Sequence, residues 1–133
     1  MGAKIKQDSE RLYYRNFPIR AEAGAPKTFN QENRSLEVVC TTEALTQVYD
    51  YERMAVVNEV LLMSGAKLPP SKQIPLLDSH DRYSVKSILG SARELAISGD
   101  KLISKVVFSS DPESENVMIK VAEGHATDYS VGY

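Results

Sequence analysis

The chain has 133 residues, about the length of one domain with a modest single core. Apolar residues make up 42% and charged residues 26%, which is ordinary for a soluble globular protein. A formal net charge of −2 gives no basic footprint for nucleic acid and no polybasic membrane signal. No stretch approaches the roughly 18 consecutive apolar residues that a membrane span needs. We therefore expect neither nucleic acid nor a membrane among its partners.

The first residues, 1–11, are polar and predict a flexible N-terminal arm ahead of a domain over 12–133. The start is basic, but no apolar run follows it, so a secretory signal is not expected. Cys40 is the only cysteine, which excludes an internal disulfide and fits a reducing cytoplasm. It ends an apolar run, so we interpret it as a buried thiol and not as a nucleophile.

Strand character dominates the first half of the chain. Residues 12–20 are rich in aromatic and branched residues and predict a strand, with Pro18 confined to an edge or a bulge. A loop is expected over 21–34 and a further strand over 35–41. Within 48–63, apolar residues occupy both alternation classes, which favours a strand buried on two sides. A helix is the competing interpretation of this stretch.

Turn chemistry predicts a loop over 64–74, from which residues 75–78 lead into His80. Two more strands are expected at 84–97 and 101–108, joined by the turn 98–100. The second strand alternates, with Leu102, Val106 and Phe108 on one face and Lys105 on the other.

Residues 111–124 have the strongest helix signal. Asp111 is a plausible N-cap, Pro112 suits the first helical position, and Gly124 supplies the stop. The apolar face of this helix comprises Val117, Met118, Val121 and Ala122. A final strand over 126–133 carries Ser130. The fold class is therefore mainly β with α: a small, mostly antiparallel barrel or sheet with a flanking helix.

Candidate chemistry begins with the two histidines. His80 lies where an apolar strand breaks into a polar stretch, a common position for catalytic groups. The alternative is a surface histidine among charges. His125 follows a helix stop and is interpreted as a C-cap that interacts with the helix carbonyls.

Ser130 is a candidate nucleophile, because Gly132 lies two residues later and small neighbours let a substrate carbonyl approach the backbone. On composition alone, other serines compete with it: Ser79, Ser84, Ser91 and Ser109. Phosphate-binding loops and dinucleotide fingerprints are missing, and the histidines and the cysteine are too scattered for a zinc site. No metal or nucleotide cofactor is expected.

Three segments in series resemble the prohead (head maturation) protease family of tailed phages. Their order and spacing match that family over roughly residues 34–133, and residues 12–20 resemble it more weakly. The segments are 60–81, with PLLDSHD around His80; 88–109, with ILGSAR at its start; and 124–133, with GHATDYSVGY around Ser130.

The resemblance implies a relative of the herpesvirus assembly protease, built as a small β-barrel with flanking helices. It implies that His80 is the general base and Ser130 the nucleophile of a serine endopeptidase. Its substrates would be the major capsid protein precursor and the scaffold, and it would act in the host bacterial cytoplasm, within the assembling prohead. A homo-oligomer is left open.

The residue that orients the base has no matching position, because the family contributes it from beyond the serine strand. We therefore expect a domain that is incomplete at its C-terminus and a 133-residue chain that lacks full activity alone. Within the chain Asp78, Asp81, His125 and Asp128 are weak candidates for this role. Oxyanion donors could be backbone amides near Ser130 or the side chains of Arg82 and Arg93. The alternative function is a noncatalytic assembly or scaffold module that keeps the protease fold.

Overall fold

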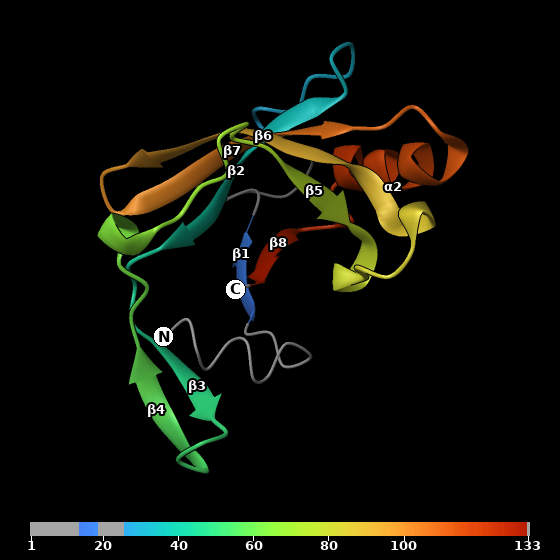
Figure 1. Cartoon of the computed structure of the whole chain (residues 1–133). Coiled ribbons are helices and arrows are strands. Elements are labelled where there is room, and N and C mark those ends of the chain that lie inside the picture. Colours follow the sequence, from blue (N-terminus) through green and yellow to red (C-terminus); the bar gives the residue numbers. More distant parts are fainter. Residues whose placement is uncertain (1–13, 19–25, 133) are drawn as a thin grey trace.

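The computed structural model describes residues 14–18 and 26–132, and for 14–18 the backbone alone (Figure 1). This part of the chain is mainly antiparallel β with one α-helix, as the sequence predicts. The arm expected over 1–11 lies outside the described residues. The elements are β1 (Tyr14–Pro18), β2 (Ser35–Thr42), β3 (Thr46–Asp50), β4 (Ala55–Glu59), η1 (Met63–Gly65), β5 (Ile74–Leu77), η2 (Asp78–His80), η3 (Val85–Ser87), β6 (Ile88–Ser98), β7 (Lys101–Phe108), α2 (Pro112–Ala122) and β8 (Asp128–Gly132).

A four-stranded antiparallel sheet in the order β2-β7-β6-β5 forms the body of the molecule. The hairpin β6–β7 turns at Gly99, which takes the left-handed φ of 62° that such a turn needs. The expected alternation of β7 is confirmed, since its core face consists of buried or half-buried residues. The strand predicted from residue 84 begins later, at Ile88, because the 3₁₀ turn η3 comes first. The core face of β7 comprises Leu102, Ser104, Val106 and Phe108.

Two bulges curve this sheet. In β6, Glu94 and Leu95 together face Ser104 of β7, and Glu94 has a left-handed φ of 55°. In β2, Cys40 is the extra residue opposite β7. A bulge increases the local twist and bends its strand. The sheet therefore wraps around the elements that pack on its inner face (Figure 1).

Helix α2 packs its apolar face into the core beside β6 and β7, as predicted. Asp111 caps its first turn, where the side chain accepts from the backbone N–H of Ser114. At its end the N–H groups of Gly124 and His125 donate to the carbonyls of Val121 and Lys120, a Schellman motif with Gly124 at φ 86°. The core between sheet and helix contains Leu36, Val38, Cys40, Ala92, Leu95, Val106, Phe108, Met118 and Val121.

The stretch 48–63 differs from both sequence interpretations. It is neither a helix nor one strand buried on two sides, but most of the exposed hairpin β3–β4 with a turn at 51–54. Asp50 starts the turn by accepting from the N–H groups of Glu52 and Arg53. The hairpin projects from the body (Figure 1), so Val56 is 62% exposed. Apolar residues occupy both alternation classes here without burial.

The last strand, β8, pairs antiparallel with β1, and both strands contact β2. Strands are thus confirmed within the ranges 12–20 and 126–133. The described strands fall into three sheets, one of four strands and two of two strands. A closed barrel, which the family resemblance implies, stays a prediction.

Candidate active site

His80 is presented by a tight turn directly after β5. Residues 78–81 form this turn, in which the N–H of Asp81 donates to the carbonyl of Asp78 over 2.9 Å. The two central residues, Ser79 and His80, have left-handed φ values of 51° and 56°. Left-handed backbone is unfavourable for any residue with a Cβ, and such outliers cluster at functional sites. The turn directs the half-buried imidazole toward β8.

Ser130 lies at the middle of β8, where its backbone pairs with that of Asn16 in β1. Its neighbour Tyr129 packs against the core and makes a side-chain hydrogen bond with Cys40. Burial raises the pKa of Cys40 to about 11 and also raises the pKa of Tyr129. At 1% exposure Cys40 is the buried thiol that the sequence predicts. Tyr129 therefore fixes the strand that carries the serine.

The fold brings these two residues together. His80 Nε2 lies 3.0 Å from Ser130 Oγ, although the residues are 50 positions apart in the chain. That distance is within the range for a base that takes a proton from a nucleophile. Partial burial lowers the pKa of His80 below 6.5, because a desolvated imidazole resists protonation. The imidazole is therefore neutral at pH 7 and can accept the hydroxyl proton.

Asp78 and Asp81, the acidic residues beside His80, accept hydrogen bonds from residues of the loop that carries them. One carboxylate oxygen of Asp81 accepts from the N–H of Tyr83 over 2.9 Å, and the other accepts from Ser87 Oγ over 2.5 Å. These hydrogen bonds lower the pKa of Asp81, with the bond from Ser87 as the larger cause. Asp78 accepts from Ser79 Oγ over 3.1 Å.

His125 acts as the expected helix cap through its backbone N–H. Its side chain is 73% exposed, with Nε2 3.5 Å from a carboxylate oxygen of Glu123. Asp128 is exposed at the start of β8. The side-chain contact of His125 thus lies at the end of α2.

The two arginines considered as oxyanion donors have other contacts. Arg93 Nε donates to Ser91 Oγ over 2.8 Å, and the guanidinium of Arg82 lies 6.0 Å from the ring centroid of Tyr83. Backbone amides near Ser130, the other candidates for this role, stay a prediction.

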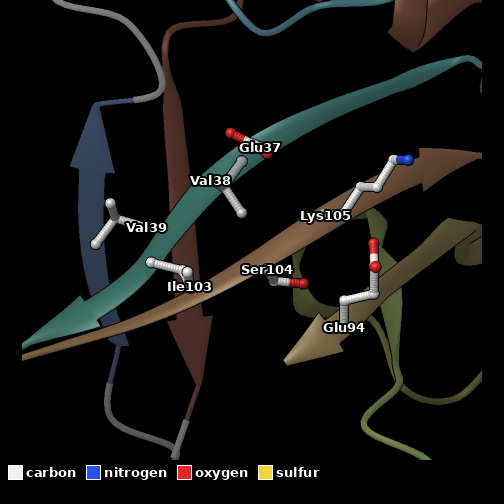
Figure 2. A pocket seen from close by; sticks show the side chains of 7 residues that line it. All are labelled: Glu37, Val38, Val39, Glu94, Ile103, Ser104 and Lys105. Carbon is white, nitrogen blue, oxygen red and sulfur yellow. The ribbon is translucent and has the colours of Figure 1, made fainter. Parts of the chain in front are cut away.

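The surface also has a hollow of about 380 Å³, whose lining side chains are shown in Figure 2. It is lined by residues of β2 and β7 together with Glu94 at the bulge of β6. Neither His80 nor Ser130 contributes to it. Its lining residues are Glu37, Val38, Val39, Glu94, Ile103, Ser104 and Lys105.

Among the described residues, no group of three or more His, Cys, Asp or Glu side chains could hold a metal ion. Nor does this part of the chain contain a helix long and apolar enough to cross a membrane.

Sequence reasoning missed two supporting residues, Ser87 and Tyr129. The turn-forming Asp81 signals the hydrogen bond from the N–H of Tyr83, two residues later, but no local pattern indicates its bond with Ser87. Nothing in the sequence links Tyr129 to Cys40, because they lie on strands far apart in the chain.

Comparisons with protein-family models, with curated proteins and with solved structures gave no significant match.

Proposed function

We propose that this chain is the catalytic domain of a serine endopeptidase of the prohead-protease type. The observation that carries the proposal is the contact between His80 Nε2 and Ser130 Oγ at 3.0 Å. A hydroxyl nucleophile needs a base within hydrogen-bond reach, and a neutral imidazole is the most frequent such base.

The chemistry follows from this contact. His80 Nε2 takes the proton of Ser130 as Oγ attacks the peptide carbonyl, which forms a tetrahedral oxyanion. The imidazolium then donates that proton to the leaving amine, the C–N bond breaks, and an acyl-enzyme remains. In the second half of the reaction a water molecule attacks the acyl carbonyl while His80 takes its proton. The ester bond to Oγ then breaks, the proton returns to Oγ, and the carboxylic acid product leaves. For the first step the imidazole must carry its own proton on Nδ1.

The strand arrangement supports a barrel-like site. Four strands follow the order β5-β6-β7-β2, β2 contacts both β1 and β8, and His80 after β5 meets Ser130 on β8. The order β5-β6-β7-β2 followed by the pair β1-β8 corresponds to a small barrel. Such a barrel would be open in two places, between β2 and the β1–β8 pair and between β8 and β5. The catalytic pair would then lie across the seam between β5 and β8.

The substrates follow from the resemblance alone. They are the major capsid protein precursor and the scaffold, cleaved within the assembling prohead in the host cytoplasm. The proposed chemistry needs no metal and no nucleotide.

A noncatalytic assembly module is the second candidate. The observation that favours it is the position of the hollow, which lies away from His80 and Ser130. A module of this kind would bind capsid or scaffold protein without cleaving it.

A fluorophosphonate probe separates the two functions, because it reacts covalently with a serine that a base activates. We expect the complete gene product to be labelled at Ser130, as located by mass spectrometry of the peptides. Ser130→Ala should abolish labelling, and the control Ser109→Ala, at an exposed serine, should not. Co-expression with the capsid-protein precursor of the same genome should then give cleavage that Ser130→Ala prevents. An unlabelled protein that still binds this precursor would establish the assembly module instead.

A further inference from the structure

The loop that carries His80, residues 78–87, has little apolar packing to hold it. It is bounded by Leu77 and Ile88, which pair with each other at the end of the β5–β6 ladder. Neither the turn at 78–80 nor the 3₁₀ turn η3 contains a buried residue. Its apolar side chains face water, and Tyr83 and Val85 are each 83% exposed. Something other than hydrophobic burial must therefore fix the imidazole.

The turn at His80 also needs support because of its backbone conformation. Two consecutive left-handed residues at the centre of a hydrogen-bonded turn correspond to type I′ geometry, which favours Asn, Asp and Gly. Histidine is tolerated in left-handed backbone, but Ser79 has no such preference. A turn of this kind persists only where its surroundings over-determine it.

Polar contacts from Asp81 supply that support. Its N–H closes the turn on the carbonyl of Asp78, while its carboxylate reaches forward to the N–H of Tyr83 and to Ser87 Oγ. The carboxylate thus joins the start of the loop to its end, next to the paired Ile88. We call these contacts from Asp81 the Asp81–Ser87 bracket.

We propose that Asp81 and Ser87 are positioning residues that hold the His80 imidazole against Ser130. The bracket fixes the peptide that follows His80, and the pairing of Leu77 with Ile88 anchors the segment before it. With both sides fixed, the backbone of the turn has little freedom to change its conformation. This inference rests on the proposed function, since it gives the bracket a part in the reaction of the same pair.

The loop offers a matched set of variants. Ser87→Ala removes the hydroxyl that binds Asp81, and Ser87→Thr keeps a hydroxyl at that position. Ser84→Ala is the control, because Ser84 Oγ accepts from the N–H of Lys86 and has no part in the bracket. The two alanine variants remove the same atom from the same exposed loop.

Two measurements on the complete gene product test the bracket. The first is the pKa of His80 by NMR titration of the imidazole, which needs no catalytic activity. In Ser87→Ala we expect this pKa to rise toward 6.5, because a released ring is better hydrated. The second is the rate of fluorophosphonate labelling at Ser130, which we expect to fall by about 10- to 100-fold, because a 1 Å misplacement of a catalytic group can cost about 10²-fold in rate. Ser87→Thr and Ser84→Ala should keep wild-type values in both measurements.

The outcomes separate this inference from the proposed function. If wild-type Ser130 is not labelled, the proposed function fails, and the NMR titration alone decides whether the bracket holds His80. If the wild type is labelled while Ser87→Ala keeps both the wild-type rate and the wild-type pKa, the bracket is overturned and the function stands. Equal effects of Ser84→Ala and Ser87→Ala would also overturn it, because they would indicate general loosening of the loop.

Discussion

The two halves of the candidate site are held in opposite ways. Ser130 lies on a strand whose neighbour Tyr129 is packed into the core and hydrogen bonded to Cys40. His80 lies on an exposed loop fixed by polar contacts and left-handed backbone. The serine is thus tied to global stability, whereas the histidine is tied to local order. Changes near His80 should alter reactivity with little loss of stability, and changes beside Ser130 should alter stability first.

The largest expected effect is on reactivity alone. His80→Ala should lower the labelling rate of Ser130 by about 10²–10⁴-fold, the usual contribution of a general base. Precursor cleavage should fall by several orders of magnitude, as it does when a unit of this kind loses one member. The free energy of unfolding should change by only about 0.5 kcal/mol, because the loop around His80 has no buried residue. Urea denaturation followed by circular dichroism, together with the labelling rate, checks both halves of this expectation.

A smaller effect, now on stability, is expected beside the serine. Tyr129→Phe should lower the free energy of unfolding by about 1 kcal/mol, because the buried thiol of Cys40 loses its hydrogen-bond partner. Tyr83→Phe is the matched control, since Tyr83 is 83% exposed. Denaturation in urea measures both variants. Equal stabilities of the two would show that Tyr129 does not anchor β8.

The pH dependence of the labelling rate should follow the protonation of His80. The pKa of His80 is lowered below 6.5, so its neutral form persists at mildly acidic pH. The labelling rate should be constant above pH 6.5 and should fall as the pH drops through the lowered pKa. The folded state disfavours the charged ring, so the stability contributed by His80 is full above pH 6.5 and decreases below it. A rate profile with its acidic limb above pH 6.5 would contradict this assignment.

How much the sequence predicts depends on the range of the interactions. The cap of α2 and the alternation of β7 depend on residues close together in the sequence, so the sequence pattern was sufficient to predict both elements. The sequence of the hairpin β3–β4 favours a buried strand, because its apolar residues occupy both alternation classes, a pattern typical of strands buried on two sides. Its turn could have been found from Asp50, a residue that favours turns.

The pairing of His80 with Ser130 was predictable only through the family resemblance. No local pattern connects His80 with Ser130, because the contact spans 50 positions and needs the whole sheet between them. The left-handed backbone of Ser79 and His80 carries only a weak sequence signal, because histidine is enriched in this conformation but serine is not. Neither residue is Gly or Asn, and the conformation is imposed by contacts with residues later in the loop.

The smallest expected effect concerns His125, the histidine outside the contact. His125→Asn should leave the labelling rate of Ser130 within about twofold and the free energy of unfolding within about 0.5 kcal/mol, because an exposed ion pair of this kind contributes little. The helix end keeps its Schellman bond, since the backbone N–H of residue 125 still donates to Lys120. Asparagine also tolerates helix ends. The measurement is the labelling rate beside that of His80→Ala, with urea denaturation of both. A loss of labelling equal to that of His80→Ala, at unchanged stability, would place His125 in the catalytic site and remove the distinction between the two histidines.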